Sequence, residues 1–211
     1  FDWLDRSSDE VIGIFDEAHN LEDAAREHSS RTLTQETLER AELELAEEGR
    51  EAEEAREVVE AFREAVENAV EGKLDFGQAE RLGNDWEDVT VELDEGDDYP
   101  DEVTRKLYSG SVHEGDEVTR RVREGMKLAS RLDRRYEREY KSGDADKRKE
   151  CPSLSVFSFI RDYLEKADEP GYLPIAGVRR SQDGDGVETR LELYTCIPRE
   201  VMGDLFDSLH S

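Results

Sequence analysis

The chain has 211 residues, enough for one or two domains with a hydrophobic core. It carries 56 acidic against 29 basic residues, a formal net charge of -27, and no apolar run approaches the roughly 20 residues of a membrane span. We therefore expect a soluble, cytoplasmic protein with no membrane partner. Two cysteines, Cys151 and Cys196, are too few for a disulfide framework or a four-cysteine metal site.

The acidic charge has two explanations. High net charge with low hydrophobicity favours disorder, whereas many surface carboxylates also keep a folded protein hydrated in a salt-rich cytoplasm. We favour the second, because the apolar residues recur periodically and the aromatic residues are spread along the chain. Overall charge then says little about nucleic-acid binding, while local clusters of Lys and Arg remain informative.

The first predicted element is a strand at residues 11–15, a β-branched apolar run that is too short for a helix. Runs of this kind are typical of parallel strands that are covered on both faces. The acidic pair Asp16 and Glu17 follows the strand directly.

A long helical period begins near Thr34, with apolar residues three, four or seven positions apart, and ends near Gly72. The pattern predicts either one long helix or two helices that are broken near Gly49. Its many charged residues are typical of a solvated helix face.

Residues 83–101 are rich in turn formers and acidic residues, and residues 89–93 form either a short strand or an extended loop. Further helices are predicted at residues 117–140 and 154–166, with Ser153 as the N-terminal cap of the later one. Alternating apolar residues at 172–179 and 187–196, separated by Asp-Gly turn residues, predict a β-hairpin. Pro198 opens a closing helix over residues 199–209.

Strands near both ends thus flank a helical stretch of about 130–150 residues. This order predicts an α/β domain that is interrupted by a mostly α-helical insertion. We expect no internal repeat.

The segment that carries chemistry is Asp16, Glu17, Ala18 and His19, directly behind the strand at residues 11–15. Carboxylates at the carboxyl end of a buried parallel strand lie where open α/β sheets bind their ligands. In nucleotide hydrolases the first carboxylate holds Mg²⁺ on the phosphates, and the second can orient and deprotonate the attacking water. An exposed strand-to-helix turn is the alternative reading.

The run Phe-Asp-Glu-Ala-His-Asn-Leu-Glu-Asp from Phe15 resembles motif II of superfamily 2 helicases, in the form found in XPD-type helicases. In that family a helical arch domain is inserted between motifs II and III. The segment from Leu191 to Phe206 resembles the strand and helix that return the chain to the motor core. The resemblance implies motor-domain residues at 1–30 with the DEAH box, a helical arch at 31–170, and a hairpin and helix returning to the motor domain at 171–211.

By this resemblance Asp16 coordinates Mg²⁺, Glu17 activates water, and Asp16 and Glu17 contact ATP. His19 couples the nucleotide site to the DNA-binding and second motor domains, with a hydrogen-bonded turn histidine as the alternative. The chain is expected to be a piece of a longer protein, called the parent below. The parent is expected to be a 5′–3′ DNA helicase of a halophilic archaeon, associated with the nucleoid and acting on single-stranded DNA and DNA forks in repair.

The 211 residues contain no phosphate loop and no set of four cysteines. The family's 4Fe-4S cluster would therefore belong to the parent only. We expect this piece alone to be inactive in ATP hydrolysis.

Basic residues between positions 120 and 149 stand out from the acidic background and suggest contact with single-stranded DNA through phosphates and stacking. The candidates are Arg120, Arg123, Arg131, Arg134 and Tyr136. Pairing with neighbouring Glu and Asp is the alternative for these arginines.

Two other classes of function stay open. Long acidic amphipathic helices also suit a protein-interaction module without catalytic activity, which would dock repair proteins through the arch. A non-helicase ATPase with a similar Asp-Glu-Ala-His strand is the third alternative.

Overall fold

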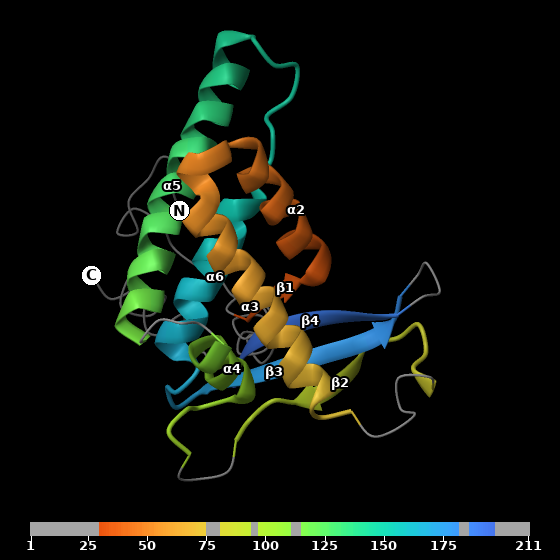
Figure 1. Ribbon diagram of the computed structural model, residues 1–211. Helices are drawn as coiled ribbons and strands as arrows, with labels where there is room; N and C mark the ends of the chain where they lie inside the picture. Colours follow the sequence, from red (N-terminus) through yellow and green to blue (C-terminus); the bar gives the residue numbers. More distant parts are fainter. Residues whose placement is uncertain (1–29, 75–80, 94–96, 111–114, 182–185, 197–211) are drawn as a thin grey trace, which may run out of the picture.

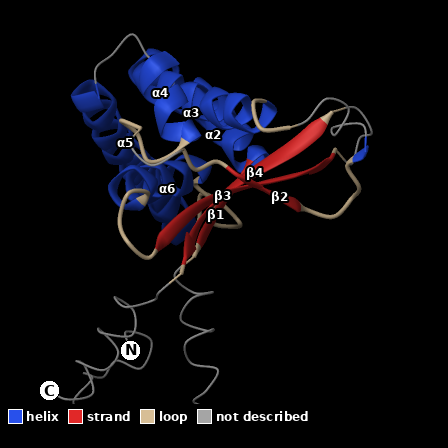
Figure 2. Cartoon of the chain, turned by 90° about the horizontal axis from the view of Figure 1, so that it is seen from below, coloured by secondary structure: helices blue, strands red, loops and turns tan. Residues whose placement is uncertain are grey.

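A computed structural model describes the chain at residues 30–74, 81–93, 97–110, 115–181 and 186–196. This part is a mixed α/β structure in which the helices cover one face of an antiparallel sheet (Figure 2). The mixed α/β class expected from the sequence is thereby confirmed. The helices are α2 (Gln35–Glu47), α3 (Glu53–Glu71), α4 (Glu102–Gly110), α5 (Gly115–Ser142) and α6 (Pro152–Lys166) (Figure 1).

The sheet has four strands in the order β1-β4-β3-β2, and each neighbouring pair is antiparallel. The strands are β1 (Arg31–Thr34), β2 (Glu87–Thr90), β3 (Tyr172–Arg180) and β4 (Val187–Thr195). The predicted hairpin is therefore confirmed as β3 and β4, and its register pairs Ala176 with Leu191. Residues from the stretch expected to be helical add one strand on each side of it.

Alternation of side chains across the strands fixes which face of the sheet is buried. Leu33, Leu191 and Leu193 point to the helices and are at most 3% exposed. The segment predicted as strand or loop does form a strand, at Glu87–Thr90, two residues earlier than expected. Strand β1 was not predicted, because four residues are too few for an alternating pattern.

The long helical stretch is two helices. The chain breaks at a 3₁₀ turn, Gly49–Ala52, where Gly49 has φ of 69°, a conformation that side chains other than glycine rarely adopt. Thr34 caps α2 as predicted, since its side chain accepts the Thr37 backbone N–H, and Gly72 is the C-cap of α3.

The helix predicted at residues 117–140 is confirmed as α5, whereas the start predicted for α6 was wrong. Helix α6 begins at Pro152, and its N-cap residue is Cys151. The Ser153 backbone N–H donates to Oε2 of Glu44 on α2 at 2.9 Å, so a distant carboxylate replaces the local serine cap. Helix α4 was not predicted.

Aromatic rings join α3 to α6 at the centre of the core. Phe62 lies edge-on to Tyr163 at 5.9 Å between ring centroids, and Phe159 stacks on Tyr163 at the same distance. The buried Tyr163 hydroxyl donates to Oδ1 of Asp101 at 2.7 Å, while Asp101 also accepts the Thr104 backbone N–H at 2.9 Å. Burial raises the pKa of Asp101, and the hydrogen bonds of this carboxyl join the start of α4 to α6.

Gly125 sets how closely α5 approaches α6. A Cβ added at Gly125 would lie 2.9 Å from Cδ1 of Phe157 and closer still to two further ring carbons. Phe157 is fully buried, so its ring has little room to move.

Gly125→Ala should therefore destabilise the chain, although alanine at an open helical position would stabilise it by about 1 kcal/mol. Overpacking of this kind costs about 1–3 kcal/mol. The free energy of unfolding, measured by urea titration, should fall for Gly125→Ala and stay nearly unchanged for Arg131→Ala at an exposed position of the same helix. A more stable Gly125→Ala variant would contradict the packing described here.

Candidate functional site

The residues of the Asp-Glu-Ala-His motif, Asp16, Glu17 and His19, lie outside the described residues. The strand predicted at residues 11–15 and the helix predicted after Pro198 do so too. Within the described part of the chain, no group of three or more His, Cys, Asp or Glu side chains is arranged to hold a metal ion. The predicted nucleic-acid residues, by contrast, all fall on α5.

Helix α5 carries its basic residues on the side away from the core. Successive residues of a helix are about 100° apart, so positions that recur every three or four residues share one face. Buried residues such as Val122, Ala129 and Leu132 define the inner face. The opposite face carries what we call the basic ridge, made of Arg120, Arg123, Lys127, Arg131, Arg134, Arg138 and Lys141, all of them exposed.

Ion pairing differs along the ridge. Arg120 donates to Glu117 at 2.6 and 2.8 Å, and hydrogen bonds from Arg120 and then Arg121 lower the pKa of Glu117 to about 2. In the described part of the chain Arg123, Arg131 and Arg134 form no ion pair. The alternative expected from the sequence, pairing with neighbouring carboxylates, thus holds for Arg120. The other three predicted arginines keep their guanidinium groups available to a ligand.

The arginines on the flanks of α5 serve the fold instead. Arg121 bonds to Glu57 of α3 at 3.0 Å, and Arg135 forms a two-pronged pair with Glu48 beside α2. The hydrogen bond from Arg135 lowers the pKa of Glu48. These contacts hold α5 against α3 and the end of α2, so the ridge has a fixed orientation.

Tyr136 lies on the inner side of α5 and is only 4% exposed. Arg135 and Lys149 lie over its ring, at 5.3 and 4.9 Å from the centroid. Because the Tyr136 ring is buried and these two cations lie over it, a base cannot stack on it. The exposed aromatic residue at this end of α5 is Tyr140, which is 49% exposed.

The second basic stretch, residues 147–149, is partly neutralised. Arg148 bonds to Asp133 at 2.8 Å, and Lys149 lies 3.4 Å from a carboxylate oxygen of Glu47. These ion pairs hold the loop before α6 against α2 and α5, which favours a structural role for this stretch.

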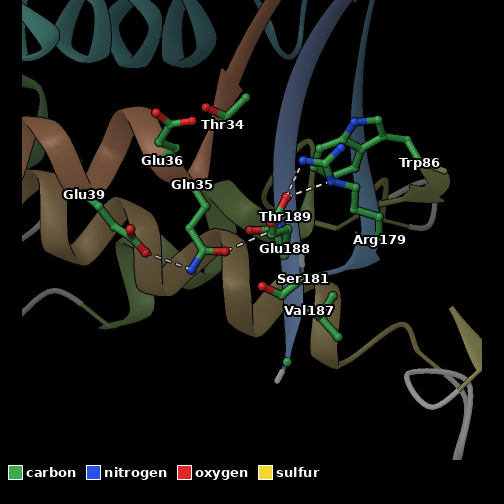
Figure 3. Close-up of a pocket in the computed structure, with 11 residues that line it drawn as sticks. Thr34, Gln35, Glu36, Glu39, Trp86, Arg179, Ser181, Val187, Glu188 and Thr189 are labelled. Carbon is green, nitrogen blue, oxygen red and sulfur yellow. Dashed lines mark hydrogen bonds and ion pairs between the residues drawn. The ribbon is translucent and has the colours of Figure 1, made fainter. Parts of the chain in front are cut away.

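A polar pocket of about 430 Å³ lies where α2 begins beside β4 (Figure 3). Arg179 donates to Glu188 at 2.7 Å and lies 4.4 Å from the ring centroid of Trp86. Arg190 approaches the same ring at 4.9 Å. Because these guanidinium groups already cover the indole and pair with carboxylates, the pocket is a packed polar corner of the sheet, and Trp86 serves there as a packing residue.

Three members of the ridge, Lys127, Arg138 and Lys141, are not among the nucleic-acid candidates named from the sequence. The signal was present in their spacing, since each continues the interval of three or four residues that relates the arginines. What the spacing could not reveal was the burial of Tyr136, which depends on the side of α5 that meets α2 and α6.

The comparisons with known proteins found no matching family model and no matching curated protein. Within the described residues, no helix combines the length and apolar content needed to cross a membrane. The geometry of the basic ridge indicates what it can bind. A rigid row of cations with several unpaired guanidinium groups is suited to phosphates or carboxylates.

Proposed function

We propose that the chain is part of an ATP-dependent 5′–3′ DNA helicase of the XPD type. Residues 1–30 would belong to the first motor domain and carry the DEAH box. Residues 31–170 would form the helical arch, and residues 171–211 would return to the motor domain. Repair of DNA in the nucleoid is the process in which such a protein would act.

The observation that carries this proposal is that the first and last strands of the described residues lie side by side. The first strand, β1, pairs with the last strand, β4, with Arg31 opposite Leu193. The Thr195 backbone N–H also donates to the Ser30 hydroxyl at 3.0 Å. A domain inserted into a host needs its two ends side by side, and here they are joined by sheet hydrogen bonds.

ATP chemistry in this proposal belongs to the motif that precedes β1. Asp16 would hold Mg²⁺, which neutralises charge on the phosphates, and Glu17 would orient and deprotonate the attacking water. Carboxylates are the ligands that Mg²⁺ prefers, so the donor set fits the ion. His19 would pass the state of this site to the DNA-binding and second motor domains.

The 4Fe-4S cluster of the family would be held elsewhere in the parent. Such a cluster needs four thiolates, and this chain has two cysteines. Cys151 is buried between α2 and α5, where its thiol approaches the Ala129 carbonyl at 3.6 Å. Burial raises the pKa of the Cys151 thiol, which disfavours the thiolate that ligation requires.

The basic ridge supports the DNA-binding part of the proposal. Single-stranded DNA is held chiefly through its phosphates, and a straight row of cations on a rigid helix suits an extended backbone. Arg131, Arg134 and Arg138 form no ion pair in the described part of the chain, and cations three or four residues apart repel one another, so this part of the ridge weakens α5 slightly. A feature that costs stability and faces solvent is better explained by a ligand than by the fold.

The catalytic assignment is tested in the complete protein by Glu17→Gln. The amide cannot take a proton from water, so ATP turnover should fall by at least about a hundredfold while ATP binding persists. Steady-state phosphate release measures the first and fluorescent-nucleotide titration the second. Arg56→Gln, at an exposed position on α3, is the control. Unchanged turnover in Glu17→Gln would contradict the role given to Glu17.

The DNA assignment is tested by reversing charge on the ridge in the full chain. Arg131→Glu with Arg134→Glu should weaken binding of fluorescent oligo-dT, and the salt slope of the affinity should shrink by about 0.7 for each lost phosphate contact.

Arg131→Glu alone should raise the free energy of unfolding by ~0.2–0.5 kcal/mol per ion pair gained, because the new carboxylate has cationic neighbours one helical turn away.

Arg50→Glu with Arg56→Glu is the matched control, since it reverses two charges away from α5. Equal losses in the ridge and control variants would show that only net charge matters. If the unaltered chain binds no single-stranded DNA at any salt concentration, the DNA-binding role of the ridge is contradicted and a protein-interaction module becomes the better explanation.

A further inference from the structure

A groove between α4, α5 and α6 has an apolar floor. It encloses about 310 Å³, and Val122, Met126, Leu164 and Tyr108 line it. The last three are half-buried: each packs against the core with part of its side chain and turns the rest toward the groove. Such a floor offers room for bulky apolar side chains of a ligand.

The rim of the groove is cationic. Arg123, Lys127 and Arg161 surround the floor, with Glu165 as the acidic residue among the lining side chains. Lys127 pairs with Glu124 at 2.8 Å but keeps a side chain that is 62% exposed, and Arg161 pairs with Asp162 at 2.7 Å and is 44% exposed. Arg123 forms no ion pair within the described residues, so on a chain of net charge -27 its guanidinium group beside the apolar floor favours a ligand of opposite charge.

We propose that this groove docks an acidic, amphipathic peptide segment of a partner protein. One or two large apolar side chains of the peptide fill the floor, and its carboxylates meet the rim, which is the helix-in-groove mode of peptide recognition. Met126 adapts its shape to the inserted side chain because its chain is unbranched and flexible. The proposal does not depend on the helicase assignment.

The floor argues against a nucleic acid as the occupant. Bases are held by stacking on exposed aromatic faces, whereas the floor is mostly aliphatic. Its single aromatic ring, Tyr108, already contacts Tyr99 at 5.7 Å between centroids. The phosphate-binding face of the ridge also continues beyond the groove, toward Arg138.

The test uses the full chain and a fluorescent helix-forming peptide of Glu and Ala with two Leu residues on one face. Fluorescence anisotropy should show binding in the micromolar range for this peptide. A scrambled peptide of the same composition, with its Leu residues on opposite faces, should bind at least about tenfold more weakly. A third peptide with Lys in place of Glu should not bind.

Two groove variants separate the contributions of floor and rim. Met126→Glu should weaken binding at least about tenfold at both low and high salt, because it places a charge in the floor. Arg123→Glu with Lys127→Glu should weaken it chiefly at low salt, since about 1 M salt shortens the screening length to about 3 Å. The exposed rim positions keep the test valid if Met126→Glu does not fold.

Arg138→Glu is the matched control. It reverses one charge of the same kind on the same helix, roughly 22 Å from Arg123 at 1.5 Å per residue, and should leave peptide binding unchanged. Equal affinity for the scrambled peptide, no effect of the rim variant, or an equal loss in Arg138→Glu would each overturn the proposal. Oligo-dT binding, measured on the same variants, reports separately on the proposed helicase function.

Discussion

The pairing of β1 with β4 is the constraint on which the rest of the structure depends. It ties the residues before α2 to the end of the chain's last described strand, with Leu33 opposite Leu191. Strand β1 is therefore one edge strand of the sheet, and β2 is the other edge strand. The helices between β1 and β3 all lie on a single face of the sheet, where α3 and α6 meet through Phe62 and Tyr163 (Figures 1 and 2).

Charge is distributed unevenly over this closed body. Arginines on the flanks of α5, such as Arg121 and Arg135, pair with carboxylates of neighbouring elements and stabilise the packing. On its outer face, Arg123, Arg131 and Arg134 lack such carboxylates within the described residues, and the groove beside α6 adds a cationic rim to an apolar floor. One helix thus holds the fold together on its inner side and offers two surfaces of different chemistry to ligands: a ridge that suits phosphates and a groove that suits an acidic peptide.

Local signals made much of this predictable. The break at Gly49, the cap at Thr34 and the hairpin follow from residues close together in sequence, and the ridge follows from helical spacing. Strand β1 and the start of α6 did not, because each depends on a partner more than a hundred residues away: β4 for the strand and Glu44 for the helix. The burial of Tyr136 depends on how α5 packs against its neighbours, which the spacing of residues in the sequence does not reveal. The DEAH box remains a prediction from sequence, since Asp16 and Glu17 lie outside the described residues.

The central claim is that this closed body is inserted into a helicase motor between the DEAH box and motif III. The most direct measurement is to sequence the coding region on both sides of the 211 residues. A Gly-Lys-Thr phosphate loop and four clustered cysteines upstream, with Ser-Ala-Thr or Ser-Gly-Thr directly downstream, are the predicted result. Flanks without these motifs would contradict the helicase assignment and leave a domain that binds acidic peptides as the better account.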